Sequence, residues 1–318
     1  MPAVQFVMLQ ILKKKQRNLR MNLKNTEINF PLGIYEKAID KRLTFVDKIK
    51  VAKKAGFDFI EMSVDESDEF AARLDFSKNQ IKEIRDALFE NDFYINSLCL
   101  SLHRKFPFGA KDENVRQKAL EIMEKALILA KNLGIRIIQL AAYDIYYEQP
   151  HPDSEIFFIQ TMKKIVQLAK KYSVTIAFES MDTKFAGTIS RLLYLQKQIG
   201  SDVLLYPDLG NLSRFSNDLE AEIKLGKSEI VAFHFKDTLP GIFKNLEFSQ
   251  GDVDFVSAFS YILKAQIVVP FVIEMWHKEE NFDQNLPLSE NMAKQSQIIA
   301  KARDFFIENL RIAYENQR

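Results

Sequence analysis

Four short apolar runs in this chain each end on a side chain that can bind a metal ion. A charged group at the end of a buried strand is costly unless it is paired or bound to something. All four runs lie in the second half of the chain. We therefore predict one site, built from neighbouring strand ends, with room for one hard divalent cation. The four end residues are Glu179, Asp208, His234 and Glu274.

Three carboxylates and one imidazole also predict a chemistry. Such a set suits Mn²⁺ or Mg²⁺, and Co²⁺ or Zn²⁺ can also bind it, whereas a structural zinc would prefer cysteines. If Glu179 and Glu274 lie on opposite sides of the ion, one can remove a proton from a carbon beside a carbonyl and the other can return it. The cation would stabilise the intervening enediolate. Return of the proton to the opposite face inverts the carbon, which is epimerisation.

The elements that must position these residues alternate regularly along the chain. Short apolar runs separated by segments with apolar residues at every third or fourth position predict strands alternating with helices. Eight such units with no break in composition predict an α/β fold, a single (β/α)₈ barrel. The predicted strands are 32–35, 57–64, 95–101, 136–141, 175–179, 203–206, 230–234 and 271–275. The predicted helices are 44–55, 77–90, 112–133, 154–172, 187–199, 218–227, 253–265 and 291–314.

This barrel would bring the four residues together. Catalytic residues of such barrels lie at the C-terminal ends of strands, and the four residues end strands five to eight. Neighbouring strands lie about 4.8 Å apart, so four consecutive strand ends can converge on one ion. Any one of the four alone would be equally consistent with an exposed strand end.

Signals at the segment ends agree with these boundaries. Gly56 and Gly134 follow predicted helices, where a left-handed residue is favoured, and Ser77 begins a Ser-x-x-Gln capping box. The long stretch without a predicted element, 236–252, is expected to be a functional loop. We expect 29–318 to form one catalytic domain and 1–28 to be an extension, since Met21 offers a second start.

Composition narrows the function classes. A net charge of +1 gives no general field for nucleic acid or a membrane. The single cysteine, Cys99, cannot form an internal disulfide, which favours a reducing compartment, and we expect a cytoplasmic protein. The apolar run near the N-terminus precedes its basic residues and is too short to span a bilayer, so it does not resemble an export signal.

Six motifs, in order, resemble the L-xylulose-5-phosphate (L-ribulose-5-phosphate) 3-epimerases of the L-ascorbate degradation route. The likeness runs from about Pro31 to Asn309. The motifs are ProLeuGlyIleTyrGluLysAla at 31–38, GluMetSerValAspGluSerAsp at 61–68, ArgIleIleGlnLeuAlaAlaTyrAsp at 136–144, TyrProAspLeuGlyAsnLeuSer at 206–213, HisPheLysAspThrLeuProGlyIlePheLysAsn at 234–245 and IleGluMetTrp at 273–276.

The resemblance implies a xylose-isomerase-like barrel in which Glu179 and Glu274 transfer the proton and the four residues named above surround one divalent metal. It also implies a ketopentose 5-phosphate substrate that is inverted at C3. The sequence departs from related free-sugar epimerases at one place. They carry a further glutamate shortly after the fifth strand, where this chain has SerMetAspThrLysPhe; either Asp182 substitutes for it, or a phosphorylated substrate does not need it.

The substrate should meet cations and amides at the mouth of the barrel. Lys236, Lys244 and Asn245, in the loop after strand seven, are candidates for the phosphate, followed by His103 and Arg104 after strand three. For His103, a hydrogen-bonded loop histidine is an equally good interpretation. Asn211, three residues after Asp208, could bond a sugar hydroxyl.

Three other functions compete with this hypothesis. An aldose–ketose isomerase on the same barrel would use nearly the same site. A metal-dependent DNA repair endonuclease would need more histidines than four and a basic face. A non-catalytic sugar-phosphate binding protein would bind without exchanging the C3 proton. The expected partner is a small sugar phosphate, with a second copy of the chain, as a homodimer, the one protein partner considered.

Overall fold

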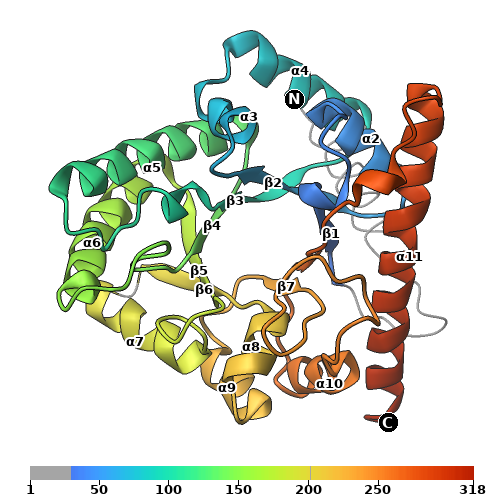
Figure 1. The fold of residues 1–318 in the computed structure, drawn as a ribbon. Helices are drawn as coiled ribbons and strands as arrows, with labels where there is room; N and C mark the ends of the chain where they lie inside the picture. Colours follow the sequence, from blue (N-terminus) through green and yellow to red (C-terminus); the bar gives the residue numbers. More distant parts are fainter. Residues whose placement is uncertain (1–29, 201) are drawn as a thin grey trace, which may run out of the picture.

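Eight parallel strands form a ring at the centre of the structure, as predicted (Figure 1). The computed structural model describes residues 30–200 and 202–318, so the predicted extension 1–28 lies outside the described residues. The order around the ring is β6-β5-β4-β3-β2-β1-β8-β7. The strands are β1 (Leu32–Tyr35), β2 (Phe59–Val64), β3 (Ile95–Leu100), β4 (Ile137–Ala141), β5 (Thr175–Glu179), β6 (Val203–Tyr206), β7 (Phe233–Phe235) and β8 (Phe271–Ile273).

Strands β6 and β7 are joined by single bridges, which complete the ring. Leu205 pairs with Ile230 and Asp208 pairs with His234, both in parallel. Between them lies Pro207, which has no N–H to donate to a ladder, although its carbonyl accepts from the His234 N–H at 2.9 Å. The predicted strand 230–234 is therefore wrong at its start, because Ile230 forms only an isolated bridge. The bridge also sets Asp208 directly beside His234.

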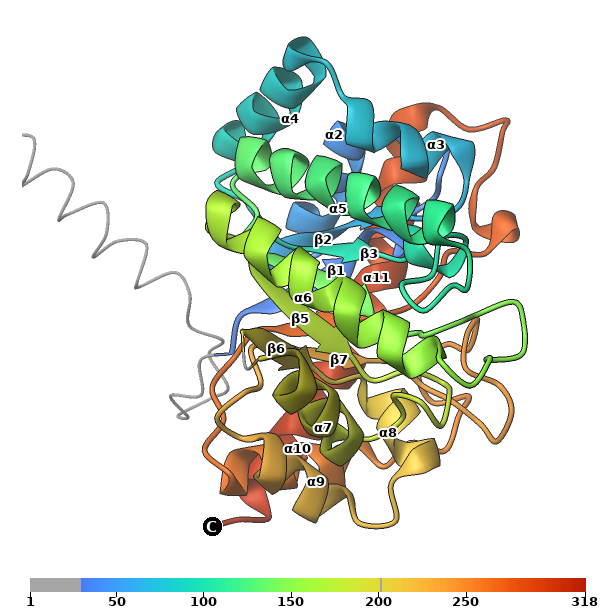
Figure 2. The same ribbon diagram turned by 90° about the vertical axis from the view of Figure 1, so that its left-hand side faces the viewer.

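Helices surround the ring and cover the outer faces of its strands (Figures 1 and 2). Strands covered on both faces read as near-continuous apolar runs, which explains why they were recognisable. The α-helices are α2 (Phe45–Lys54), α3 (Asp68–Ala71), α4 (Lys78–Glu90), α5 (Glu113–Leu133), α6 (Ser154–Tyr172), α7 (Ile189–Ile199), α8 (Leu209–Phe215), α9 (Leu219–Gly226), α10 (Phe255–Lys264) and α11 (Leu288–Glu315). The 3₁₀ turns are η1 (Glu36–Ala38), η2 (Ala72–Asp75), η3 (Leu102–Arg104) and η4 (Glu279–Asn281).

The predicted helix ends are confirmed where their signals were strongest. Ser77 and Gln80 form a reciprocal capping box at the start of α4. Gly134 ends α5 with φ of 75°, and Gly56, after α2, has φ of 86°. The short helices α3 and α8 were not predicted, and α8 is the more important because it begins next to Asp208.

Two apolar layers hold the barrel. The larger lies between the strands and the helices, and the smaller fills the barrel interior. A Cβ on Gly33 would overlap the ring of Phe59, so the glycine allows this ring to occupy the interior. Cys99 is buried in the same interior cluster. Within the described residues, no helix is long and apolar enough to cross a membrane.

Candidate active site and metal centre

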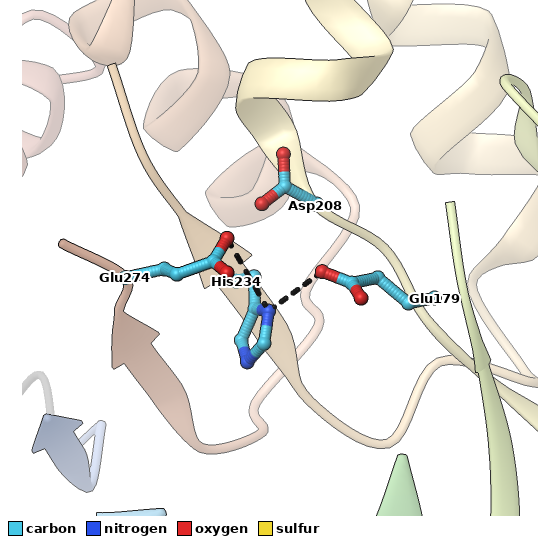
Figure 3. A group of neighbouring side chains, drawn as sticks. All are labelled: Glu179, Asp208, His234 and Glu274. Atoms are coloured by element: carbon cyan, nitrogen blue, oxygen red, sulfur yellow. Dashed lines mark hydrogen bonds and ion pairs between the residues drawn. The ribbon is translucent and has the colours of Figure 1, made fainter. Parts of the chain in front are cut away.

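Four buried side chains converge at the C-terminal ends of strands β5 to β8 (Figure 3). They are the residues predicted from the sequence, and each offers one ligand atom within 4.8 Å of the others. In Figure 3, Glu274 and Glu179 reach the imidazole of His234 from opposite sides, with Asp208 near all three. This cluster could hold a metal ion.

Asp208 is oriented by the helix that follows it. It is the N-cap of α8, and its Oδ1 accepts from the N–H of Asn211 at 2.6 Å. Asn211 in turn donates from Nδ2 to the carbonyl of Ser180 at 2.7 Å. The Ser180 hydroxyl accepts from the Asp208 N–H at 2.9 Å. Asn211 is fully buried in this network and is not among the residues that line the pocket beside the cluster. Its backbone N–H helps to orient Asp208, and its bond to a sugar hydroxyl stays a prediction.

His234 lies between two carboxylates. Its Nδ1 is 2.8 Å from Oε1 of Glu179, and its Nε2 is 2.6 Å from Oε1 of Glu61. Burial alone would lower the pKa of His234, but the charges of Glu61 and Glu179 outweigh it and raise this pKa well above the ordinary value. Gln139 donates to the other oxygen of Glu179. The negative surroundings that attract a proton to this ring also favour a metal cation.

Two carboxylate oxygens at the centre of the cluster are left without hydrogen bonds. These are Oδ2 of Asp208 and Oε2 of Glu274, and neither finds a hydrogen-bond partner in 30–200 or 202–318. Lys236 Nζ lies 3.4 Å from the first and 3.3 Å from the second, as an ion pair. Burial raises the pKa of Asp208 well above its usual range, whereas Lys236 and His234 overcome burial and lower that of Glu274. Carboxylate oxygens that accept no hydrogen bond and already attract a cation fit a hard divalent ion.

A family comparison decides the wider relationship. A family model described as a xylose isomerase-like TIM barrel matches residues 49–308. The chain belongs to this family. The probable L-ribulose-5-phosphate 3-epimerase UlaE of Mycoplasma pneumoniae is 52% identical over 274 residues, which are 86% of this chain and 90% of that protein. The L-ribulose-5-phosphate 3-epimerase UlaE of Salmonella paratyphi C is 42% identical over 276 residues, 86% of this chain and 93% of that protein.

A solved structure supports the fold within this family. A structure of an L-ribulose 3-epimerase matches with a TM-score of 0.73 at 17% identity, covering 91% of this chain and 97% of that chain. The predicted (β/α)₈ barrel, and its resemblance to the xylose-isomerase-like group, are therefore confirmed.

The pocket beside the cluster contains two of the predicted substrate residues. Lys236 and Lys244 line it together with Glu179 and Glu274. Lys236 lies deep, beside the carboxylates, whereas Lys244 is on the loop that follows β7. Asn245 is exposed next to Lys244, has φ of 64°, and does not line the pocket. Its contact with a substrate stays a prediction.

Asp237 anchors the loop that carries Lys244. Its carboxylate accepts from the backbone N–H groups of Ser249 at 3.0 Å, Gly251 at 2.8 Å and Val253 at 3.3 Å. No helix or strand occurs between β7 and α10, as predicted for 236–252. One buried side chain thus replaces regular structure in fixing this loop, and it does so within three residues of His234.

The structure places His103 outside the lining of the pocket. Its ring is buried, with Nε2 bonded to the carbonyl of Ala119 at 3.1 Å and the ring 4.2 Å from that of Phe108. The neighbouring Arg104 lines the pocket instead. Both belong to the 3₁₀ turn η3, in which successive side chains point about 120° apart, so only one of them can face the pocket.

The guanidinium of Arg104 lies near two aromatic rings, and one of its N–H groups makes no hydrogen bond in the part of the chain that the structure describes. Its guanidinium carbon lies 5.7 Å and 5.1 Å from the ring centroids of Tyr143 and Tyr146. Its buried Nε has no hydrogen-bond partner among the described residues. Burial and the nearby charge of Arg104 lower the pKa of Lys244. Two cations facing one pocket favour an anionic ligand.

Asp182, the candidate substitute for the glutamate of the free-sugar epimerases, lies in the pocket. It lines the pocket and accepts a hydrogen bond from the hydroxyl of Tyr143. Tyr143 and Trp276 contribute aromatic surface to the pocket wall.

Glu61 and Gln139, which contact the cluster, were not predicted from the sequence. For Glu61 the available signal was a lone ionisable residue inside the apolar strand β2.

Proposed function

We propose that this protein is a carbohydrate-phosphate epimerase that interconverts L-ribulose 5-phosphate and L-xylulose 5-phosphate by inverting C3. The observation that carries the proposal is the pair Glu179 and Glu274, which reach the buried cluster from opposite sides (Figure 3). Epimerisation needs one group on each face of the reacting carbon, and an arrangement with both on one face would not invert it. The near full-length similarity to relatives named for this reaction supports the substrate.

In the proposed reaction, one of the two glutamates takes the proton from C3 and the electron pair of the C–H bond moves toward the C2 carbonyl. The other glutamate then gives a proton to the opposite face of C3. One C–H bond is broken and one is formed at the same carbon, so the reaction needs no oxidant or reductant. Before the next turnover the glutamate that took the proton releases it to solvent and the other takes one up from solvent. Running the reaction in reverse exchanges the two roles.

We infer that Glu179, Asp208, His234 and Glu274 hold one divalent cation, Mn²⁺, Mg²⁺, Co²⁺ or Zn²⁺. When bound, the cation would polarise the ketose carbonyl and stabilise negative charge on the adjacent oxygens. The two carboxylate oxygens of Asp208 and Glu274 that accept no hydrogen bond from the described residues support this assignment. Lys236, which is deep in the pocket, is suited to contact a sugar oxygen near the reacting carbon rather than the distant phosphate.

The phosphate is assigned to Arg104 and Lys244, which line the same pocket. Arginine suits this role because its planar fork can bind two phosphate oxygens at once. A cytoplasmic location is supported by the free, buried thiol of Cys99. The place of the reaction in L-ascorbate degradation rests on the resemblance described above.

A product assay in D₂O tests the function. L-ribulose 5-phosphate incubated with the metal-loaded protein should give L-xylulose 5-phosphate with solvent deuterium at C3, detected by proton NMR. Appearance of an aldose phosphate instead would identify an aldose–ketose isomerase. Binding without any C3 exchange would show a sugar-phosphate binding protein and refute the proposed reaction.

A further inference from the structure

Glu61 lies in the barrel interior behind His234, where the proposed reaction does not use it. It is the third residue of β2, and its side chain is fully buried. Its Oε2 accepts from the hydroxyls of Ser97 and of Tyr206, the latter at 3.0 Å. Its Oε1 faces Nε2 of His234 at 2.6 Å. The carboxylate thus connects strands β2, β3 and β7 with the end of β6.

This geometry restricts the imidazole. An ionised carboxylate can only accept hydrogen bonds, so a contact of 2.6 Å between Oε1 of Glu61 and Nε2 of His234 requires a proton on that nitrogen. By the same argument Nδ1 carries a proton when no cation is bound, and that proton is the one that a cation at the cluster would displace. That nitrogen faces Oε1 of Glu179 at 2.8 Å and Oε2 of Glu274 at 3.8 Å, in the middle of the carboxylate cluster.

We propose that Glu61 is a positioning residue that holds His234 as the Nε2–H tautomer and thereby makes Nδ1 the metal-binding atom. The inference rests on the proposed metal site. The opposite tautomer would bring the Nε2 lone pair against an oxygen of Glu61 and point an N–H at the site where a cation should bind. Metal-binding histidines commonly donate their second N–H to a carboxylate, and loss of this partner costs about 10- to 100-fold in metal affinity.

The burial of Glu61 argues that it is more than a space-filling residue. An ionised carboxylate inside a barrel is strongly disfavoured unless its hydrogen bonds and charge are compensated. Packing alone would be satisfied by an uncharged side chain of the same size. Here the compensation comes from the hydroxyls of Ser97 and Tyr206 and from the Nε2–H of His234, the ring that faces the proposed cation.

Calorimetric titration of the metal-free protein with Mn²⁺ tests the inference without reference to catalysis. Glu61→Gln, which keeps the shape but removes the charge, should bind Mn²⁺ about 10- to 100-fold more weakly than the wild type. Tyr206→Phe is the matched control, because it removes one hydrogen bond to Glu61 and keeps both the carboxylate and the ring that packs 4.8 Å from His234. It should bind Mn²⁺ nearly as the wild type does.

A second measurement needs no variant. Nitrogen-15 NMR of the wild-type protein loaded with Mg²⁺ or Zn²⁺ should show His234 protonated at Nε2, and the chain has only four histidines to assign. Unchanged Mn²⁺ affinity in Glu61→Gln, or a proton on Nδ1 in the loaded wild type, would overturn the role of Glu61 while leaving the metal site intact. A wild-type protein that binds no divalent ion would instead refute the metal site and this inference with it.

Discussion

At the scale of single residues, the proposed proton transfer by Glu179 and Glu274 can be tested most directly. Glu179→Gln and Glu274→Gln keep the side-chain shape but cannot carry a proton between substrate and solvent. Because positioned acid–base groups contribute about 10²- to 10⁴-fold, each variant should lose conversion of L-ribulose 5-phosphate to L-xylulose 5-phosphate by about that factor. Glu280→Gln is the control, since Glu280 is exposed and lies six residues beyond Glu274. If conversion persists at the wild-type rate in either variant, the proton-transfer assignment is wrong.

The proposed role of Arg104 and Lys244 in specificity for the phosphate group can be tested separately. A hydrogen bond to a charged group is worth about 1.5–3 kcal/mol, so Arg104→Ala and Lys244→Ala should each raise KM for L-ribulose 5-phosphate by about 10- to 100-fold. Neither should much alter turnover of unphosphorylated L-ribulose. Lys82→Ala serves as a control because Lys82 is an exposed cation on α4, paired with Asp86 and away from the pocket. An equal effect on both sugars would exclude the phosphate role.

The substrate residues show what single positions in a sequence do not reveal. His103 and Arg104 are adjacent, and the choice between them depends on the rotation of one 3₁₀ turn, which has too few residues to show a periodicity. Glu61 lies in a strand that is buried on both faces, where alternation does not distinguish the barrel interior from the helix side. The four metal-cluster residues were easier because each interrupts an apolar run at its C-terminal end.

At the scale of elements, long helices and buried strands could be predicted and short connecting elements could not. Strands β1, β5 and β6 and helix α6 have the predicted bounds. Helix α8 was missed because its seven residues include Gly210 and Asn211, which are poor helix formers. Its start is set by the side chain of Asp208 acting as a cap, and the same side chain was already assigned to a metal.

The turn η1 and strand β2 are fixed to their neighbours by a buried charge cluster. Glu36 pairs with Lys48 at 3.1 Å and with Arg73, and accepts from the Ser63 N–H at 2.5 Å. Burial raises the pKa of Glu36, but Arg73 and Lys48 outweigh it, so the pKa in the folded protein is lowered. The stabilisation from Glu36 is therefore complete above the ordinary glutamate pKa of about 4.3 and is lost as the pH falls through the lowered value.

Glu36→Gln tests this cluster by its pH dependence. Removing one partner of a buried ion pair leaves uncompensated charge. At pH 7 the free energy of unfolding of the variant, measured by urea titration, should therefore be about 3–5 kcal/mol lower than that of the wild type. The difference from the wild type should narrow below about pH 4, where the wild-type carboxylate gains a proton. Glu121→Gln, which breaks an exposed pair with Lys118, should change stability little at any pH. Parallel pH curves for Glu36→Gln and the wild type would contradict the lowered pKa.

At the scale of the whole molecule, the barrel could be predicted because it repeats one unit, and its closure could not. Eight apolar runs separated by helical segments leave few alternatives. The join between β6 and β7 depends on two isolated bridges around Pro207 and leaves no pattern in the sequence. This join matters for function, because it is where Asp208 meets His234 and the ring of strand ends becomes a single site.

A site made from four strands at this join links metal binding to the stability of the entire barrel. Glu179, Asp208, His234 and Glu274 come together only in the folded chain, so a bound cation stabilises the folded state over the unfolded one. At a free concentration of 100 times Kd, this stabilisation is about 2.7 kcal/mol. Removal of the cation should not leave the carboxylates without any compensating charge, because Lys236 still forms ion pairs with Asp208 and Glu274.

Removal and return of the metal should therefore change activity and thermal stability together. After treatment with EDTA and dialysis, C3 exchange should stop and Tm in scanning calorimetry should fall by several degrees, because each kcal/mol corresponds to about 2–4 °C in larger domains. Adding Mn²⁺ should restore both, with a Tm that rises with the Mn²⁺ concentration. His234→Asn should remove the response of Tm to Mn²⁺, whereas His151→Asn, at a histidine that bonds the Gly109 carbonyl outside the cluster, should keep it. A His234→Asn protein that still gains stability from Mn²⁺ as the wild type does would place the ion elsewhere in the molecule.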